Sequence, residues 1–574
     1  MKPLRHNSRI LASERGFTMI VTLGVLLVSS LLMVAAFTAA NGDIHLTQSD
    51  QAAKRAYYAA LAGVQDYEYH LTQDGNYLNY CTTPTPENPA LNQAYKTGTK
   101  TPLKASELKK PLVEVPGSGG SEQYAIQLLP AESNEETFPK CNTSNVVESM
   151  VEQKLGGAAG TFRLASTGFA EGKERTIVAT FKNLNFVSYV WYTVYETGDS
   201  VLYNEPRPEC AHYYVGRVGC TKFDNFFITG ESVNGPMHTE DHGGICGEPE
   251  LGRTEADRIE FGNGNNKVAK EGYDNEGRCA AAKPKIKGKL IPPSETLSIK
   301  PPPGDEELEH IVEPAYKYSG KTEIVLTGET MTVTEHVGSH PTVAEEGPPE
   351  FKKKEVKTTG VAFPPNGVIY VSGGCGTPYS PFGPVPSYTG DTTCGNVYVH
   401  GEYKKSLTIA AQNDVVINES ITTPVSGGKP TTNALLGLIA NNFVRVYHPL
   451  TGAREKKYGE GNKGPCLKSE NDTTVAPKDL EKPEIYAAIL ALKHSFIVDN
   501  FDCGTPTLGQ IKVYGAIAGL FTNGMTGVFG AKLESGYGYN LIYDNRLQVA
   551  EPPHFLNPIE AAWYVQRETL APSP

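Results

Sequence analysis

The densest group of potential metal ligands in the chain is the segment HTEDH, which runs from His238 to His242. In an extended backbone alternate side chains point to the same side, so His238, Glu240 and His242 could converge on one divalent cation. The alternative is a hydrated corner of a β structure close to Cys246 that binds no ion. We expect this second arrangement, and therefore neither a metal nor another cofactor.

Paired carboxylates are the second kind of chemistry to consider. Glycosidases place two carboxyl groups roughly 5–10 Å apart, and Asp414, Glu419 and Asp499 lie in strand-like segments where such a pair could form. Single acids at the corners of β structure are also ordinary solvated groups. The chain contains no GxxxxGK[ST], HExxH or GxSxG motif, so ATP-driven and zinc-protease chemistry have no support. We predict that the protein is not an enzyme, and keep a polysaccharide-active enzyme as the alternative.

Charge and cysteine content limit the partners and the compartment. The formal net charge of −12 argues against a nucleic-acid partner, because such proteins usually carry a basic face. The ten cysteines include no CxxC pair, which makes zinc ribbons and thioredoxin-like sites unlikely candidates. We predict five disulfides between neighbours in sequence, which implies an oxidising compartment; the alternative is that several cysteines are free buried thiols. The expected pairs are Cys81 with Cys141, Cys210 with Cys220, Cys246 with Cys279, Cys375 with Cys394, and Cys466 with Cys503.

The N-terminus contains the strongest signal. Residues 1–16 are polar and basic, and residues 17–40 contain no charged side chain. At about 1.5 Å per residue this stretch is long enough to cross a hydrocarbon core of about 30 Å. The basic flank predicts that residues 1–16 stay in the cytoplasm and that the rest is outside. A cleaved secretory signal is the alternative, but its apolar stretch is normally shorter.

The boundary between these segments resembles the prepilin peptidase site of type IV pilins, since Gly16 is followed by Phe17, Thr18 and Met19. The resemblance implies that Gly16 ends the leader and that Phe17 becomes an N-methylated mature N-terminus. It also implies prepilin peptidase and other pilins of a pilus assembly machine as partners.

One position departs from the family pattern. Major pilins carry a Glu at the fifth mature position, where this chain has Val21. In the family that Glu pairs with the terminal amine of a neighbouring subunit, and a buried amine without a partner is costly. Minor pilins of the PilX and pseudopilin-K kind resemble the chain in this respect, and AYYAALAGVQ resembles a stretch of PilX-like proteins. We therefore interpret the chain as a minor subunit that primes or tips a filament. The alternative is a stand-alone anchored protein with a pilin export signal.

The segments behind the apolar stretch predict a pilin-like unit. Residues 51–69 have apolar side chains at spacings of three and four, which predicts an amphipathic helix. Short strands are expected at 124–129, 161–167 and 176–181. We therefore assign 1–16 to the leader, 17–40 to the transmembrane half of the helix, and 41–185 to the amphipathic helix with a small antiparallel sheet.

The remaining residues predict a large β domain. Short apolar runs alternate with Gly, Asn and Asp corners, which favours a right-handed parallel β-solenoid, with a β-sandwich as the alternative. This region also resembles the β-helical domains attached to PilX-like N-termini. The expected parts are 186–281 and 361–555, which form the solenoid; 282–360, a Pro-rich insertion in which a hairpin at 322–334 leaves the solenoid; and 556–574, a capping helix with Trp563 and a tail.

Together these features predict a mainly β protein with a long N-terminal helix. It would be a single-pass cell-membrane protein with a cytoplasmic N-terminus, an extracellular C-terminal domain and possible incorporation into a pilus. Its β domain would serve adhesion or surface binding, with surface polysaccharide as a candidate partner. A structural envelope protein is a further alternative.

Overall fold

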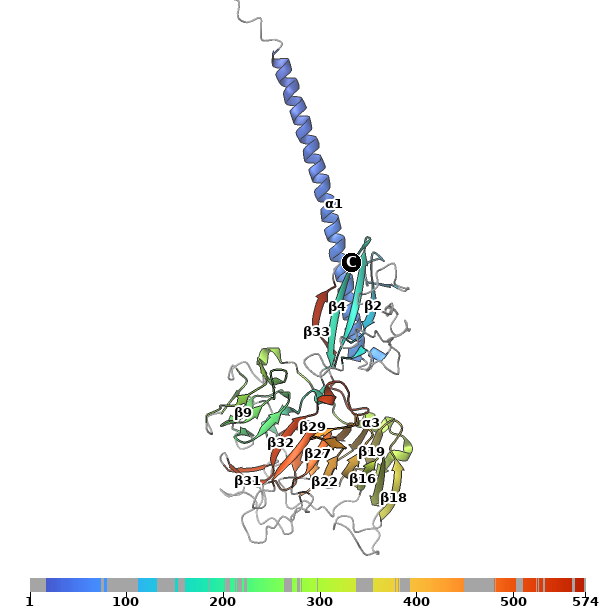
Figure 1. The fold of residues 1–574 in the computed structure, drawn as a ribbon, viewed down its shortest axis with the longest axis vertical. Helices are drawn as coiled ribbons and strands as arrows, with labels where there is room; N and C mark the ends of the chain where they lie inside the picture. The colour runs from blue at the N-terminus through green and yellow to red at the C-terminus, as the bar shows by residue number, and fades with distance from the viewer. Residues whose placement is uncertain are drawn as a thin grey trace, which may run out of the picture.

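The computed structural model contains one long helix and two β units (Figure 1). The helix α1 (Phe17–Gln73) is 57 residues long and carries the first β unit at its C-terminal half. The structure describes residues 17–73, 77–79, 112–131, 150–152, 160–183, 185–200, 202, 207–211, 213, 219–220, 225–262, 271–275, 279, 281–296, 298–336, 355–376, 378–379, 381, 393–448, 480, 482–501, 509–522, 524, 526–529, 532–559 and 563–571.

The first β unit, called the head sheet below, is antiparallel and five-stranded. Its strand order is β1 (Val113–Glu114), β2 (Glu122–Leu129), β3 (Thr161–Ala170), β4 (Lys173–Asn183) and β33 (Trp563–Leu570). The C-terminal half of α1 packs on it because Ala56, Val64 and Tyr67 recur on one face of the helix and are fully or almost fully buried. Tyr67 lies edge-on to Phe162 of β3, and Phe162 stacks on Phe181 of β4.

The strand β33 corrects the prediction of a C-terminal capping helix. Residues 563–570 pair antiparallel with β4, from Trp563 opposite Asn183 to Leu570 opposite Ile177. The Asn557-Pro558 pair is a local signal for a helix start, but the Trp-Tyr-Val run beyond it has strand propensity and finds a free edge on β4. The last strand therefore belongs to the head sheet.

This arrangement makes the second β unit an insertion into the head sheet. The chain leaves the head sheet after β4 and returns as β33, which lies beside β4 (Figure 1). We call residues 186–559 the body. Where the chain crosses between the two units, the side-chain amide of Asn185 donates to the carboxylate of Glu551, so the outgoing and returning segments are bonded to each other.

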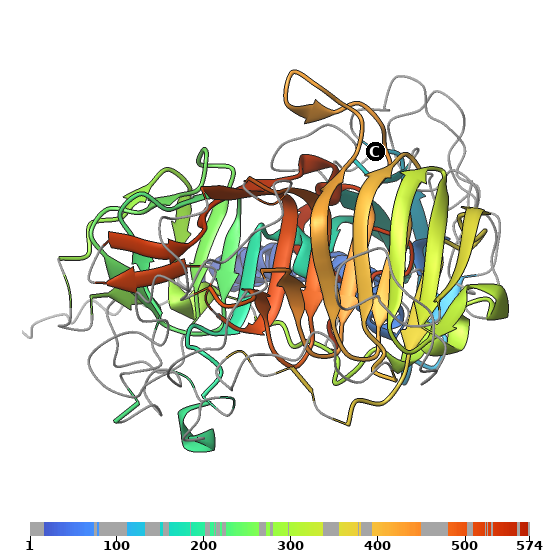
Figure 2. The same cartoon turned by 90° about the horizontal axis from the view of Figure 1, so that it is seen from below.

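The body contains a 21-stranded sheet in which parallel pairing dominates (Figure 2). Among the described strands, only β16–β17 and β17–β18 pair antiparallel in this sheet. One parallel ladder runs through β15 (Lys317–Ser319), β19 (Val368–Ser372), β21 (Leu407–Ala411), β25 (Leu436–Ala440), β27 (Glu484–Ala491), β29 (Gln510–Phe521), β5 (Trp191–Tyr195), β8 (Met237–Thr239), β11 (Arg258–Phe261) and β14 (Lys289–Ile291).

Two further ladders extend from the first around the body. The second runs through β16 (Thr322–Gly328), β20 (Val397–Tyr403), β22 (Val415–Thr422), β26 (Val444–Val446) and β28 (Phe496–Val498). The third runs from the first half of β29 through β32 (Gly538–Tyr543), β7 (Ser232–Asn234), β10 (Glu250–Leu251) and β13 (Lys285–Ile286). Parallel pairing differs from the antiparallel pattern of the β-sandwich alternative.

Stacked aliphatic side chains form the core of the body. Val399 of β20 is paired with Ile417 of β22, which is paired with Val446 of β26, and all three are fully buried. The same inward alternation produces the stack of Ile409, Leu438 and Ile489 in the first ladder. Each strand covers the apolar face of its neighbour, so the core depends on many strands at once.

The expected hairpin at 322–334 is present, but it does not leave the sheet. β16 and β17 (Thr330–His336) pair antiparallel around Gly328, whose φ of +70° favours glycine. However, β16 is also parallel to β20 over its whole length, so it is part of the second ladder. β18 (Glu355–Ala362) then pairs with β17 and ends the sheet.

The other elements are short. They are α3 (Glu306–Ile311); the three-stranded sheet of β12 (Tyr273–Asp274), β9 (Gly243–Cys246) and β6 (Phe227–Ile228); the pairs β23 (Val425–Ser426) with β24 (Lys429–Pro430) and β30 (Thr526–Phe529) with β31 (Lys532–Gly536); and 3-10 turns at Tyr77–Asn79, Phe186–Ser188, Pro208–Cys210, Pro293–Glu295, Pro314–Tyr316 and Asn545–Gln548.

Candidate functional site

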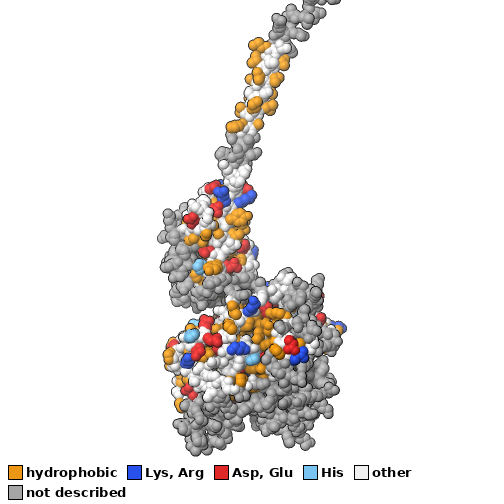
Figure 3. Space-filling view, turned by 180° about the vertical axis from the view of Figure 1, so that it is seen from behind, with side chains coloured by type: hydrophobic (Ala, Val, Ile, Leu, Met, Phe, Trp, Pro, Cys, Tyr) orange, Lys and Arg blue, Asp and Glu red, His pale blue; other side chains and the backbone are white. Residues whose placement is uncertain are grey.

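The N-terminal half of α1 is the main candidate for an interaction site. Thr18–Thr38 is long and apolar enough to cross a membrane and is not covered by any described part of the chain. Large apolar side chains surround this part of the helix, as the orange band in Figure 3 shows. Val21 lies in this stretch and is exposed. The helix fits a single-pass membrane anchor.

Three of the hydroxyl groups in this stretch donate to carbonyl oxygens within the helix. Thr22 donates to the carbonyl oxygen of Thr18 at 2.8 Å, Ser30 to that of Leu27 at 2.8 Å, and Thr38 to that of Ala35 at 2.9 Å. An unpaired hydroxyl group in hydrocarbon would cost several kcal/mol. These three internal bonds therefore lower the cost of burying this surface in lipid or against another apolar helix.

The predicted processing residues lie at the boundary of the described chain. Phe17 is the first residue of α1, and Gly16 lies outside the described residues. The expected cleavage point therefore falls at the edge of the described chain.

The C-terminal half of α1 is firmly attached to the head sheet and still presents an outer face. On the inner face, Gly168 of β3 lies against the helix backbone at Ala56. Arg55 forms an ion pair with Glu171, at 2.7 Å, in the turn between β3 and β4. On the outer face Tyr58 and Tyr69 are 62% and 61% exposed, so two large rings lie outside the head core.

The HTEDH segment forms a buried ion cluster in the body. His238 on β8 is fully buried between two carboxylates: Nδ1 is 2.8 Å from Oε2 of Glu260, and Nε2 is 3.0 Å from Oε1 of Glu240. The ring also stacks on that of Tyr192, on the neighbouring strand. Both ring nitrogens therefore already contact carboxylate oxygens, at the positions where a metal ion would have to bind.

The cluster favours a charged imidazole. Burial alone would lower the pKa of His238, but hydrogen bonds and the charges of Glu240 and Glu260 outweigh it and raise this pKa to about 9. Burial likewise opposes ionisation of Glu260, yet His238 lowers the pKa of that carboxyl overall. The cluster is a salt-bridged connection between β8 and β11.

His242 does not join this cluster. Its Nε2 lies 3.2 Å from Oδ1 of Asp274, on β12. Of the three side chains that could have converged on a cation, only His238 and Glu240 lie together, and the segment is buried rather than the hydrated corner that we expected. Across the described part of the chain, no group of three or more His, Cys, Asp or Glu side chains is arranged to hold a metal ion.

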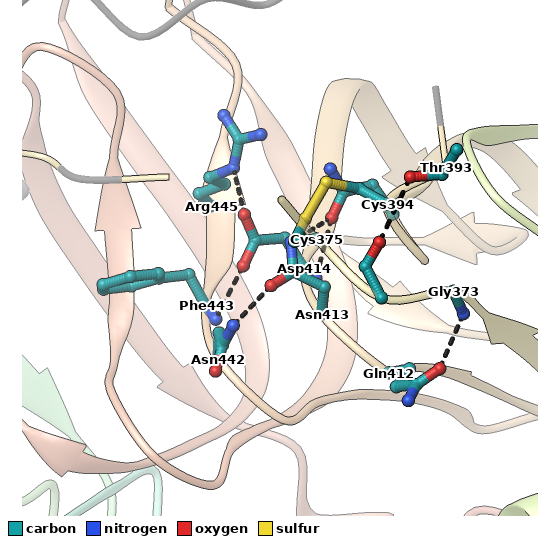
Figure 4. Close-up of a disulfide and its surroundings, with 12 residues drawn as sticks. Gly373, Cys375, Thr393, Cys394, Gln412, Asn413, Asp414, Asn442, Phe443 and Arg445 are labelled. Carbon is teal, nitrogen blue, oxygen red and sulfur yellow. Dashed lines mark hydrogen bonds and ion pairs between the residues drawn. A yellow bond between two sulfur atoms is a disulfide. The ribbon is translucent and has the colours of Figure 1, made fainter. Parts of the chain in front are cut away.

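Two of the three candidate catalytic acids bind one arginine. Arg445 of β26 is buried, with Nε 3.0 Å from Asp414 Oδ2 and Nη1 3.0 Å from Asp499 Oδ2 (Figure 4 shows Arg445 and Asp414). Burial would lower the pKa of Arg445, but Asp499 and Asp414 hold it well above its usual value. The ring of Tyr379 covers the guanidinium at 4.3 Å.

The third acid lies apart from this group. Glu419 is half-buried on β22, and it forms an ion pair with His400 Nε2 of β20 at 3.7 Å. The structure thus separates the three acids into a buried pair and a surface residue. The sequence analysis missed Arg445, although an arginine between two valines of an apolar run was a usable signal for a buried cation.

Three of the expected cysteine pairs are disulfides in the structure: Cys210–Cys220, Cys246–Cys279 and Cys375–Cys394. The expected pairs Cys81–Cys141 and Cys466–Cys503 lie outside the described residues. Cys375–Cys394 closes a loop at a corner of the body, close to Asn413 and Asn442 (Figure 4). Asn413 donates to Asn396, and Asn442 donates to Asn413, so neighbouring corners are joined by a row of asparagine amides.

Comparisons with known proteins leave the family open. No protein-family model matches the sequence, and no curated protein is significantly similar to it. Among solved structures, the competence-associated pilin ComZ from Thermus thermophilus aligns with 13% identity over 91% of this chain and 97% of that chain, at a TM-score of 0.24. A TM-score this low is below that of two chains with the same fold, so the likeness carries no weight for function.

Proposed function

We propose that the chain is a minor type IV pilin-like subunit that primes or tips a pilus or pseudopilus and presents the body for adhesion or surface binding. The observation that carries the proposal is one continuous helix whose first half is bare and apolar and whose second half packs on an antiparallel sheet. A membrane or a bundle of similar helices would bury the first half.

The sequence around Phe17 supports the same reading. The leader ends with Gly16, and the mature helix would begin at Phe17 with an uncharged stretch. Val21 stands where major pilins carry Glu, so this subunit would lack the acid that pairs with a neighbour's terminal amine. A position at the filament tip does not need that acid.

For the body we propose a right-handed parallel β-solenoid. Its support is the parallel ladders that pair strands far apart in sequence, such as β16, β20 and β22, with stacked aliphatic side chains inside. A solenoid offers long, regular outer faces, which suits attachment to an extended surface polymer.

The alternatives are a polysaccharide-active anchored enzyme and a structural envelope protein. Our proposal that the chain is not an enzyme is supported by the commitment of Asp414 and Asp499 to Arg445 and by the separate position of Glu419, which pairs with His400. Two acids bound to one buried arginine are poor candidates for acid–base work on a substrate.

The decisive experiment is to express the chain with and without a prepilin peptidase and to sequence the mature N-terminus. We expect cleavage after Gly16 and an N-methylated Phe17, and no cleavage of a Gly16→Leu variant. An intact leader in the presence of active peptidase, with a control pilin processed in the same cells, would contradict the proposal.

A further inference from the structure

One end of the body's sheet carries a row of alternating lysines. Lys283, Lys285, Lys287 and Lys289 are all exposed, whereas the residues between them are partly buried. They lie on and beside β13 and β14, which pair with β10 and β11 and with no further described strand. The alternation directs the four ammonium groups away from the core at the last turn of the sheet.

The charges of this lysine row are only partly compensated. Lys285 Nζ lies 3.2 Å from Glu248 Oε2, and Lys287 Nζ lies 2.7 Å from Glu250 Oε2. All four of these side chains are well exposed, so such pairs are weak and easily exchanged for another anion. Lys283 and Lys289 have no acidic partner within the described part of the chain. On a protein with a net charge of −12 this row is a local cationic strip.

We propose that the lysine row binds an acidic polysaccharide. The four lysines lie on and beside two consecutive short strands, so the row presents a series of point charges to a chain with repeating carboxylates. The proposal rests on the proposed function, because only an exported body would meet such a polymer.

The residues within the row argue against two other anionic partners. Pro284, Ile286, Gly288 and Leu290 separate the lysines, so the row has no aromatic ring on which a nucleic-acid base could stack. None of these residues is a large exposed apolar side chain that could insert into a bilayer. The row therefore offers a partner only positive charge. This suits a polymer whose backbone is polar and whose charges repeat.

Lysines also protect the edges of sheets from pairing with other chains, and this role competes with the proposal. The two roles predict different behaviour when the charge is removed. If the row binds the polymer, the protein without these charges loses affinity and stays monomeric. If the row only protects the sheet edge, that protein keeps its affinity and self-associates.

The test uses the full-length protein in detergent and measures binding to polygalacturonate at low and at physiological salt. The variant is K283Q/K285Q/K287Q/K289Q. The matched control, K404Q/K405Q/K429Q/K493Q, removes the same charge from four other exposed lysines of the body. Single-stranded DNA and anionic phospholipid vesicles are measured alongside, and the oligomeric state is followed by size-exclusion chromatography.

We expect binding that weakens with salt and becomes about tenfold or more weaker in the row variant, with little change in the control. Equal loss in both variants, no loss in the row variant, or tighter binding to DNA or vesicles than to polygalacturonate would each overturn the proposal. Self-association of the row variant with unchanged affinity would overturn it too. The outcome is independent of N-terminal processing, so a failure here and a failure of the pilin proposal can be told apart.

Discussion

Gly168 on β3 and Ala56 on α1 lie so close that a Cβ atom on Gly168 would overlap the carbonyl oxygen of Ala56 and lie 2.9 Å from the carbonyl carbon of Ala59. The helix therefore contacts the head sheet backbone to backbone at this point. Only glycine allows the approach, because the obstacle is the rigid helix and not a flexible side chain.

We expect Gly168→Val to separate the helix from the head sheet and to lower its free energy of unfolding by about 3 kcal/mol or more. Thermal unfolding and limited proteolysis would measure this. Gly24→Ala is the matched control, since a Cβ there meets nothing within 4 Å and should leave stability unchanged. Equal stability of both variants would show that the contact is looser than described.

The Asp414–Arg445–Asp499 group predicts a large effect of removing its cation. Arg445→Met leaves two buried carboxylates facing each other, and we expect a loss of about 3–5 kcal/mol in the free energy of unfolding. The triple variant Asp414→Asn, Arg445→Met, Asp499→Asn should recover part of that loss, because no uncompensated charge remains. Denaturant unfolding of both variants measures the difference; a single variant as stable as the wild type would contradict the ionic account.

Two buried acids that have no cation partner among the described residues predict lower stability at neutral than at mildly acidic pH. Burial raises the pKa of Glu231 to about 7 despite hydrogen bonds from Tyr539 and from the backbone of Ile228. Burial also raises the pKa of Asp305 to about 7. Because the folded state holds these protons more tightly, the contribution is full below the unfolded pKa, 4.5 for Glu231 and 3.8 for Asp305, and is lost as pH rises through about 7, by about 3 to 4 kcal/mol each.

The measurement is the free energy of unfolding at pH 5 and pH 8. Glu231→Gln should flatten the difference, whereas the exposed control Glu329→Gln should not. A wild-type protein that is more stable at pH 8 than at pH 5, with an unchanged difference in Glu231→Gln, would contradict this prediction.

His238 predicts a second loss of stability at higher pH. Its folded-state pKa of about 9 lies above the unfolded value near 6.5, so its stabilisation is full below about pH 6.5 and is lost as pH rises through 9. The size is about 3 kcal/mol. We expect thermal unfolding temperatures to fall between pH 7 and pH 9.5 in the wild type and in the exposed control His310→Gln, but less in His238→Gln. The same slope in all three proteins would show that His238 is not the titrating group.

The insertion of the body predicts that the head sheet depends on the end of the chain. Truncation after residue 562 removes β33 and exposes the edge of β4, so the head should unfold at lower temperature. Conversely, a chain in which residues 186–559 are replaced by a short Gly-Ser linker should keep a folded head, because Asn183 and Trp563 are already paired. Circular dichroism and protease resistance would report both; a truncated head as stable as the linked one would refute the role of β33.

Local patterns in the sequence determined several parts of this structure. The uncharged stretch before Asp43 and the three- and four-residue spacing of Ala56, Ala60, Val64 and Tyr67 were sufficient for a helix with one bare and one packed half. Short alternating runs likewise indicated strands of the head sheet and the hairpin at 322–334, which the structure has. Such patterns can be recognised from the sequence because they arise within one or two turns of backbone.

Only the tertiary structure decided which distant segments meet. It brought β33 to β4 against a local helix signal, surrounded His238 with Glu240 and Glu260 while sending His242 to Asp274, and placed Arg445 between Asp414 and Asp499. A strand edge or a buried charge is stabilised by whichever complementary group the fold brings close, at any separation along the chain. The spacing of residues in the sequence therefore does not determine which distant groups come together.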